Sequence, residues 1–339
     1  MKPSAATRAA GSKGGPRQYM EMPPEWYGSP EAKAIAKVVI GNQAKLGGWP
    51  KNVDTTKPIN KDPAKIEGTF DNNATFDELR LLAKIHTATK DDSLLPSINK
   101  GLDLVLISQY PTGGWPQSYP PDKSYHRYIT FNDGSMARLL FFVKETLESA
   151  DFKFIDATRK ASLQKAFDGG VDCILKCQIK VDGKLTAWCA QHDEIDYRPR
   201  EGRAFEPVSI SGNESIGIVH LLMAIKNPSP EVIRAVDAAA VWFDAVKIPG
   251  IRTEDRKTPG GEYEKDRFVI EDPSAPPMWA RFYEIGTNKP IFSDRDSKIY
   301  YKLSDIGHER RNGYRWLSYW PANFVAKEYP EWKAQHPTP

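Results

Sequence analysis

Apolar residues recur with helical spacing in three segments of the chain, and each segment leads into a glutamine. A repeat of about 3.6 residues predicts an amphipathic helix in each segment. The segments are EAKAIAKVVIGNQ from residue 31, LPSINKGLDLVLISQ from residue 95 and LQKAFDGGVDCILKCQ from residue 163. A polar loop follows each glutamine, so the chain repeats the order helix, glutamine, loop.

A second helix is predicted after each loop, behind a group of Asp, Asn or Ser residues. The helical patterns are ATFDELRLLAKIHTA from residue 74, GSMARLLFFVKETLES from residue 134 and SIGIVHLLMAI from residue 215. Asp71 and Asn72 precede the first helix, Asn132 and Asp133 the second, and Asn213 and Glu214 the third. Taken singly, these residues are typical helix N-caps.

The loops after the glutamines also repeat. QAKLGGWP at 43–50 and QYPTGGWP at 109–116 share the spacing QxxxGGWP and begin 66 residues apart. A looser copy begins 69 residues further on at Gln178, with Gly183 and Trp188 behind it. Such a repeat predicts an all-helical domain built from helical hairpins, in which the tryptophans pack against neighbouring hairpins. The stretches 192–211, 249–278 and 286–318 lack the repeat and are expected to be long irregular loops.

The polar residues before the second helices are expected to converge. In a ring of hairpins the same end of every outgoing helix lies on one face, which is expected to gather Asp71, Asn72, Asn132, Asp133, Asn213 and Glu214. Capping requires one oxygen-bearing side chain per helix, yet two adjacent ones precede each helix here. This surplus of oxygens favours a hard cation such as calcium, which takes six to eight oxygen ligands.

Composition and charge narrow the class of protein. The chain has 339 residues, and the repeat crosses most of it, so we expect one domain over residues 25–335. Residues 1–24 include a small, basic segment without an apolar core, which predicts a flexible arm or a cloning junction rather than an intact signal peptide. No apolar stretch approaches the ~18 to 20 residues that cross a bilayer, so no membrane partner is expected.

Several kinds of chemistry are disfavoured. The net charge of +3, without a basic run interleaved with aromatic residues, argues against nucleic acid. Cys173, Cys177 and Cys189 lack zinc spacing and are expected to be buried. The histidines form no HExxH motif, and His192 is either a polar site residue or a loop histidine bonded to the backbone. GxSxG, Walker and dinucleotide motifs are absent from the sequence.

Six motifs occur in order that together resemble the pectate lyases of polysaccharide lyase family ten. They are DNNAT at 71, TFNDGSM at 130, WCAQH at 188, RAFEPVSISGNES at 203, MWARFYE at 278 and FSDRD at 292. The resemblance covers about residues 25–325 and implies an α/α toroid with a wide groove formed by long loops. It also implies calcium-assisted β-elimination of α-1,4-linked polygalacturonate to 4,5-unsaturated oligogalacturonides, by a secreted, extracellular, monomeric bacterial enzyme that acts in endo mode.

The resemblance assigns roles to six residues. Asp71, Asn72 and Asp133 fall on the calcium site, where Asn72 also binds substrate and the two aspartates are catalytic. Arg203 falls on the proposed base, and Arg281 and Arg295 fall on arginines that bind substrate carboxylates. Arginine is an awkward base because its pKa lies above 12, so a carboxylate clamp is the rival role for Arg203.

Two other functions remain open at this stage. Glu214 with Asp71 or Asp133 would make the carboxylate pair of a toroidal glycoside hydrolase. A calcium-dependent module that binds acidic polysaccharide without cleaving it would use the same groove.

Overall fold

The computed structural model describes residues 14–60, 65–258 and 262–337. Contacts between Cα atoms divide the chain into two compact units, which we call the N-terminal unit (Ser4–Cys173) and the C-terminal unit (Ile174–Pro339). Within the described ranges, no helix is long and apolar enough to cross a membrane.

The single domain expected over 25–335 and the arm expected over 1–24 stay predictions. Residues 1–13 of that arm lie outside the described residues. Its later part is described, and Pro16–Tyr19 form a 3₁₀ helix, η2, that contacts α2.

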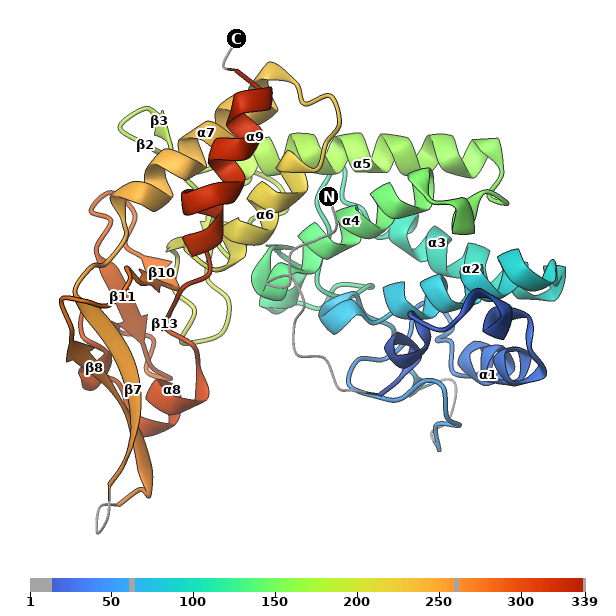
Figure 1. Ribbon diagram of the computed structural model, residues 1–339, viewed down its shortest axis with the longest axis horizontal. Coiled ribbons are helices and arrows are strands. Elements are labelled where there is room, and N and C mark those ends of the chain that lie inside the picture. Colours follow the sequence, from blue (N-terminus) through green and yellow to red (C-terminus); the bar gives the residue numbers. More distant parts are fainter. Residues whose placement is uncertain (1–13, 61–64, 259–261, 338–339) are drawn as a thin grey trace. The chain divides into compact units, whose positions relative to one another are not determined.

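Helices dominate the N-terminal unit (Figure 1). They are α1 (Pro30–Gly41), α2 (Phe76–Thr89), α3 (Leu95–Ile107), α4 (Ser135–Glu148) and α5 (Ala157–Cys177), with a short strand β1 (Ile129–Thr130) before α4. The start of α1 is fixed locally, because the Ser29 hydroxyl accepts a hydrogen bond from the Ala32 backbone N–H at 3.1 Å and Pro30 occupies the first turn. The five helices predicted in this part of the chain are confirmed.

The repeated glutamines join each loop to a later helix. Each side-chain amide donates two hydrogen bonds. One goes to a backbone carbonyl of its own loop, and the other goes to a backbone carbonyl in the first helix of the next repeat. Gln43 bonds Gly47 and Ser97 (2.8 and 2.9 Å), Gln109 bonds Gly113 and Ala166 (both 2.9 Å), and Gln178 bonds Thr186 and Ala235 (both 2.9 Å). These bonds explain why glutamine recurs at this position.

The repeated tryptophans are structural. Trp49, Trp115 and Trp188 are fully buried, and each indole N–H donates to a carbonyl of the preceding helix at 2.7 to 2.8 Å. The loops themselves need glycine, since a Cβ at Gly47 would lie 2.2 Å from the Lys100 carbonyl oxygen. Trp279 makes the same bond to the Phe243 carbonyl at 2.8 Å, which is a further copy that the sequence pattern did not indicate.

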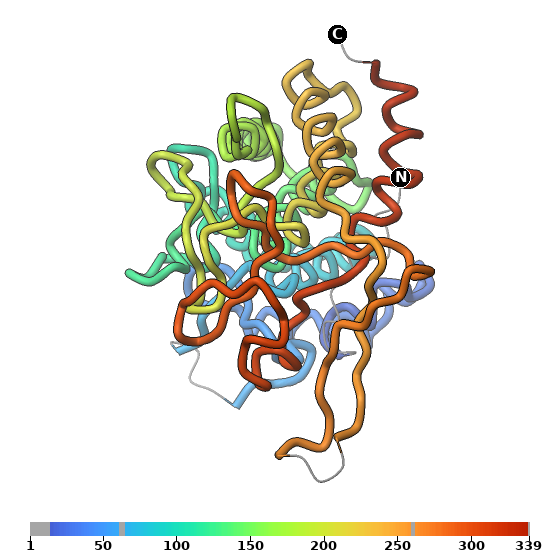
Figure 2. Tube along the Cα trace, turned by 90° about the vertical axis from the view of Figure 1, so that its left-hand side faces the viewer, coloured from blue at the N-terminus to red at the C-terminus, as the bar shows by residue number. Residues whose placement is uncertain are grey.

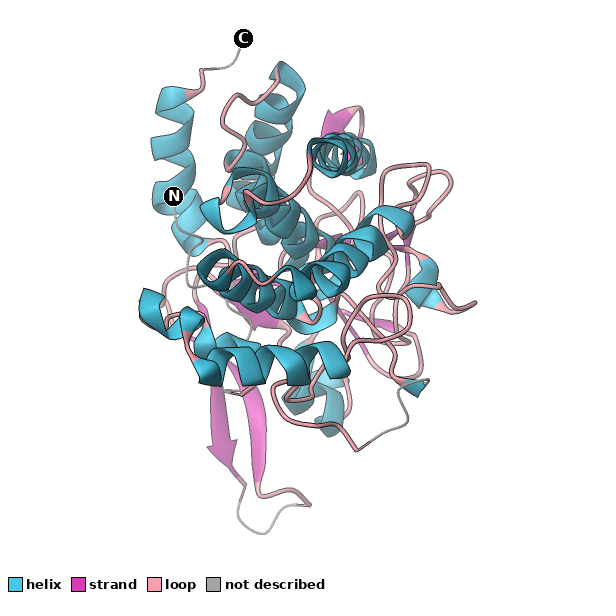
Figure 3. Ribbon diagram, turned by 90° about the vertical axis from the view of Figure 1, so that its right-hand side faces the viewer, coloured by secondary structure: helices cyan, strands magenta, loops and turns pink. Residues whose placement is uncertain are grey.

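The C-terminal unit combines helices with short strands, coloured cyan and magenta in Figure 3. Its helices are α6 (Glu214–Met223), α7 (Pro230–Ala245), α8 (His308–Gly313) and α9 (Tyr329–Gln335). An antiparallel sheet has the order β12-β11-β10-β6, with strands Ile299–Tyr300, Pro290–Ser293, Phe282–Tyr283 and Ile210–Ser211. Phe282 pairs with Ile291 on one side and Ser211 on the other. Other strands of this unit are two residues long and pair antiparallel. They are β2 (Lys180–Val181) with β3 (Lys184–Leu185), β4 (Gln191–His192) with β5 (Pro199–Arg200), and β9 (Trp279–Ala280) with β13 (Leu317–Ser318).

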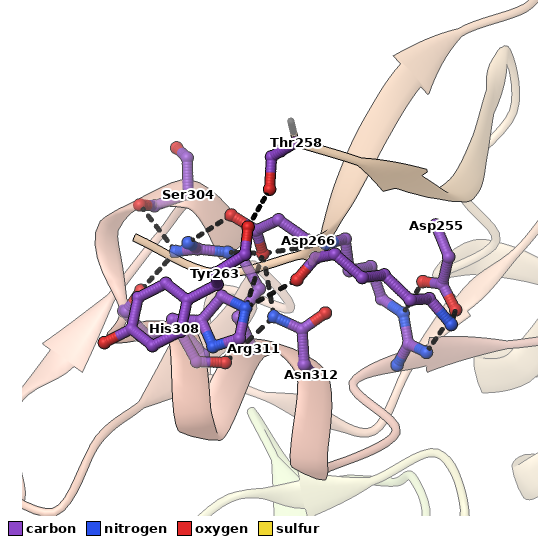
Figure 4. Close-up of polar contacts among 11 residues, drawn as sticks. Asp255, Thr258, Tyr263, Asp266, Ser304, His308, Arg311 and Asn312 are labelled. Carbon is purple, nitrogen blue, oxygen red and sulfur yellow. Dashed lines mark hydrogen bonds and ion pairs between the residues drawn. The ribbon is translucent and has the colours of Figure 1, made fainter. Parts of the chain in front are cut away.

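A long hairpin, β7 (Ile251–Lys257) and β8 (Lys265–Glu271), extends from the other elements of this unit (Figure 2). The turn end of the hairpin is tied to α8, as Figure 4 shows. The Asp266 carboxylate accepts from Arg311 Nε and Nη2 at 2.8 and 2.7 Å and from Asn312 Nδ2 at 2.7 Å. The Tyr263 ring stacks on His308 with centroids 3.7 Å apart. The bonds from Arg311 hold the pKa of Asp266 far below its usual value.

The predicted all-α toroid is wrong, because the chain has a mixed α and β fold. Region 249–278 was expected to be an irregular loop, yet it forms the β7–β8 hairpin. Its strands carry charged residues on both faces, and residues of opposite charge such as Asp255 and Arg267 pair across the two strands. The sequence therefore lacks the alternation of apolar and polar residues that predicts a strand. Most other strands are two residues long, too short to show an alternating pattern.

Candidate active site

Two loops of the N-terminal unit repeat the same unusual backbone. Asp71–Asn73 and Asn132–Gly134 each form a 3₁₀ turn before a long helix, η5 and η8. The middle residue is left-handed in both, with φ of 54° at Asn72 and 50° at Asp133. Neither α2 nor α4 has a side-chain cap, so the interpretation of these residues as N-caps is wrong. Their conformation costs of the order of 1 kcal/mol each, which is typical of functional loops.

Asp71 is a buried carboxylate whose side chain is held from two sides. Its Oδ2 accepts from Lys51 Nζ at 2.6 Å and from Gln117 Nε2 at 3.1 Å. Asn72 next to it is exposed, and its amide donates to Asn52 Oδ1 at 3.3 Å. The loop therefore presents a fixed carboxylate beside an accessible amide.

The second loop supplies an exposed carboxylate. Asn132 Nδ2 donates to Asp133 Oδ2 at 3.1 Å, which leaves Asn132 Oδ1 buried without a hydrogen-bond partner in the described part of the chain. The same is true of Gln117 Oε1, whose amide nitrogen bonds Asp71. Buried oxygens without donors are unusual, and oxygens are the ligands that calcium prefers. The residues present fit a hard cation in this respect.

Such a site would be weak without further ligands. Within residues 14–60, 65–258 and 262–337, no three or more His, Cys, Asp or Glu side chains come together as metal ligands. Lys51 also occupies one oxygen of Asp71. Two aspartates and amide oxygens would therefore leave coordination positions for water or an anionic ligand.

Arg138, in the first turn of α4, links the two loops electrostatically. Its guanidinium folds over Gly134, where a Cβ would lie 3.4 Å from Arg138 Nε. Burial lowers the pKa of Arg138, and the charges of both Asp133 and Asp71 act in the opposite direction. The two aspartates of separate repeats thus lie near one shared guanidinium. The sequence analysis missed Arg138, because a single arginine in an apolar helix gives no signal of its own.

The candidate arginines of the C-terminal unit gather around two aromatic rings. Arg203 Cζ lies 4.9 Å from the Phe205 ring centroid and 5.8 Å from that of Tyr314. Arg281 lies 4.4 Å from Tyr314, Arg295 lies 5.8 Å from Phe205, and Arg310 lies 4.4 Å from Phe205. We call Arg203, Arg281, Arg295 and Arg310 the arginine cluster. Arginine over an aromatic face is held by the ring quadrupole.

Buried carboxylates orient the cluster. Arg203 Nε donates to Glu206 Oε2 at 3.0 Å, its Nη2 contacts Glu206 Oε1, and its backbone N–H donates to Oε2 at 2.9 Å. The Tyr314 hydroxyl also donates to Glu206 Oε1, at 2.8 Å. Burial alone would raise the pKa of Glu206, but the bonds and charge of Arg203 bring it below its usual value. Glu206 is therefore ionised and forms a close ion pair with Arg203.

The other arginines have carboxylate partners too. Arg281 Nη2 donates to the buried Glu214 Oε1 at 2.6 Å. Glu309 is bonded by Arg310 and, at 3.2 Å, by Arg295, which lowers the pKa of Glu309 to about 2. The side chains of Arg203 and Arg295 remain 39% and 65% exposed, so an anionic ligand has access to them. Arg310, Glu206 and Tyr314 were not among the predicted site residues.

The structure therefore brings together Arg203, Arg281 and Arg295 in the C-terminal unit, and places Asp71, Asn72 and Asp133 in the N-terminal unit. The carboxylate pair of a hydrolase gains no support, because Glu214 is buried against Arg281 and Ser211.

His192 and the cysteines have structural roles. The His192 ring donates from Nδ1 to the Tyr197 carbonyl at 2.7 Å and accepts at Nε2 from the Cys189 backbone at 3.1 Å. Burial lowers the pKa of His192 to about 4, so the ring is neutral. Cys173, Cys177 and Cys189 are buried, as expected.

Comparison with known proteins identifies the family. The family model described as pectic acid lyase matches residues 43–325. A family 10 polysaccharide lyase from Cellvibrio cellulosa is 31% identical with a TM-score of 0.77, over 91% of this chain and 94% of that one. An aspartate-to-alanine mutant of the family 10 polysaccharide lyase from Cellvibrio cellulosa, in complex with trigalacturonic acid, has the same identity and TM-score over 91% and 95% of the chains. No curated protein matches the chain. Because the family model spans well over half of the sequence, the chain belongs to the pectic acid lyase family, as a pectate lyase of polysaccharide lyase family ten.

Proposed function

We propose that this lyase cleaves α-1,4-linked polygalacturonate by calcium-assisted β-elimination, in endo mode and outside the cell. The observation that carries the proposal is the arginine cluster, in which exposed guanidinium edges of Arg203 and Arg295 are held ready for carboxylates. Arginine is suited to this substrate, because its planar donors can bind a carboxylate through two parallel hydrogen bonds. The trigalacturonic acid bound to the related lyase supports a uronate substrate.

Asp71, Asn72 and Asp133 are the residues that would hold calcium. The orphaned oxygens of Asn132 and Gln117 beside the two aspartates support an oxygen-rich cation site. The chemistry supplied there is withdrawal of charge from the substrate carboxylate by bound calcium, which makes the neighbouring C5 proton more acidic.

Arg281 and Arg295 would bind substrate carboxylates. The bond from Arg281 to buried Glu214 fixes the direction of its guanidinium, whereas the longer contacts of Arg295 with Glu309 leave it freer to turn toward a ligand. One rigid and one adjustable arginine suit a polymer that must bind in register and then leave.

Arg203 is the proposed acceptor of the C5 proton. The proton would move to a guanidine nitrogen while the C4–O4 bond breaks and the leaving oxygen is protonated from water. Glu206 opposes this role because a neighbouring carboxylate favours the charged guanidinium, so only a small neutral fraction can act as base. Activity is therefore expected to rise with alkaline pH.

The direct test is an incubation with polygalacturonate in calcium and in chelator, followed by ultraviolet absorbance. Unsaturated product in calcium, lost with chelator, is the expected result. Reducing ends without ultraviolet absorbance would identify hydrolysis and overturn the proposal. Binding without any product would identify a polysaccharide-binding module.

A further inference from the structure

A pocket of about 280 Å³ lies within the C-terminal unit, at the hairpin and the segment 315–319. Its wall includes the buried residues Met278, Leu303 and Trp316. Its polar lining includes Asp255, Arg267 and Arg315, together with Thr253 and the half-exposed Tyr319. None of the residues of the arginine cluster lines it.

One cation of this pocket lacks a counter-charge. Arg267 is paired with Asp255 through bonds of 2.7 and 3.1 Å, and Asp255 is also bonded to Lys265 at 2.8 Å. Among the described residues, the exposed Arg315 side chain makes no hydrogen bond and no ion pair. Since Asp255 is already shared by two cations, the pocket has a positive charge available for an anion.

The side chain of Arg315 also differs in direction from that of Tyr314, whose ring packs against the arginine cluster. Tyr314 has extended backbone angles, φ −137° and ψ 143°, and its ring lies against Arg281. Successive side chains of an extended chain point to opposite sides. Arg315 therefore faces away from the cluster, so the pocket is a separate place on this unit.

The lining suits one residue of an acidic sugar. A uronate ring has an apolar C–H face, several hydroxyl groups and one carboxylate. The exposed ring of Tyr319 offers apolar surface, Thr253 and Ser318 offer hydroxyl groups, and Arg315 offers a bidentate donor.

We propose that this pocket is a second binding site for galacturonate residues of the polymer, with Arg315 as the carboxylate-binding group. The identity of the polymer rests on the proposed function. A second site raises the effective concentration of a long chain at the enzyme, whereas a short oligosaccharide gains nothing from it.

Affinity electrophoresis through gels containing polygalacturonate tests this directly, because retardation measures binding without catalysis. Arg315→Ala should weaken binding at least threefold, and Arg315→Lys should recover part of the loss. The matched control is Arg234→Ala, which removes one positive charge from α7 at a side chain that is 51% exposed. It should migrate as the wild type does, and a gel with neutral galactan should retard none of the proteins.

Kinetics give the second measurement. The KM of Arg315→Ala for polygalacturonate should rise by the same factor as its dissociation constant. Unchanged retardation, or equal losses in Arg315→Ala and Arg234→Ala, would overturn the proposal. A fall in kcat on trigalacturonate would place Arg315 in the reaction site and overturn it too. If the wild type is retarded through Arg315 but forms no product, the proposed function fails while this site stands.

Discussion

Arg203 and Glu206 form the most constrained ion pair of the candidate site. Two guanidinium N–H groups, the Arg203 backbone N–H and the Tyr314 hydroxyl all donate to one buried carboxylate. This arrangement fixes the direction of the guanidinium but also favours its charged form. A base and a carboxylate clamp would therefore respond differently to loss of the Glu206 charge.

We expect Glu206→Gln to separate the two roles. The amide keeps the shape but removes the anion, so the neutral form of Arg203 becomes easier to reach. If Arg203 is the base, the alkaline rise of kcat should move to lower pH by about one unit. The measurement is the pH profile of kcat on polygalacturonate.

Glu309→Gln is the control for that experiment, because Glu309 pairs with Arg295 and Arg310 rather than with Arg203. It should change KM while the midpoint of the profile stays in place. If Glu206→Gln raises KM but leaves the midpoint of the pH profile of kcat unchanged, Arg203 binds the substrate carboxylate and is not the base.

Replacement of Asp133 by asparagine tests the proposed cation site more cleanly than replacement by alanine does. Asparagine tolerates the left-handed backbone of this residue, whereas alanine would add about 1 kcal/mol of strain. Asp133→Asn should lower kcat at least about 100-fold, since a metal ligand is lost. Calcium titration calorimetry should show weaker binding, with an unchanged circular dichroism spectrum. Full activity and unchanged calcium affinity would remove Asp133 from the site.

At the scale of elements, the helices of the repeats could be predicted because their apolar faces recur with a strong period. The start of α5 at Ala157 was missed, since its first turn is the polar sequence ATRKAS. The sequence shows the surplus of oxygens at Asp71 and Asp133, but it does not show the left-handed backbone of Asn72 and Asp133, which depends on tertiary structure. Glu206 and Tyr314 could not be predicted as partners, because 108 residues separate them.

The β7–β8 hairpin depends on its charged anchor at Asp266. Asp266→Ala should remove the bonds from Arg311 and Asn312, so the basic strands should open locally and become sensitive to trypsin. Mass spectrometry of early fragments should locate cleavage within 251–271. Because the folded pKa of Asp266 is depressed, the wild-type anchor should stay intact over the whole pH range in which trypsin cleaves, and it is lost only as pH falls below the usual range of aspartate.

The control for the hairpin experiment is Asp244→Ala. This change removes a surface ion pair between Asp244 and Lys247, which lies outside the hairpin. It should leave the trypsin pattern unchanged. Equal resistance of Asp266→Ala and the wild type would show that strand pairing alone holds the hairpin.

At the scale of the whole molecule, the six predicted site residues are divided between the two units. The proposed cation ligands precede the division of the chain at residue 173, and the arginines follow it.

Global stability is expected to depend on Glu78, a fully buried carboxyl group of α2. Burial raises its pKa from 4.5 to about 7, and Thr55 Oγ1 donates to its Oε1 at 2.8 Å. The folded state therefore favours the protonated form. This contribution is complete below pH 4.5 and is lost as the pH rises through 7.

Glu78→Gln should remove that dependence while keeping the bond from Thr55. At pH 8 the variant should exceed the wild type in free energy of unfolding by up to about 3 kcal/mol, and the gain should shrink toward pH 5. Urea unfolding at both pH values measures the difference. A gain of equal size at both would mean that ionisation of Glu78 is not its cause.

The left-handed turn at Asp133 limits what mutation can put there. Glycine, asparagine and aspartate adopt this left-handed conformation most easily. Of the three, glycine has no side chain, asparagine has a neutral amide, and aspartate alone has a negative charge. A descendant that abandoned catalysis could thus exchange aspartate for either of the others without disturbing its architecture. If Asp133 holds the proposed calcium ion, the residue at this position in related sequences would distinguish degenerate copies from working enzymes.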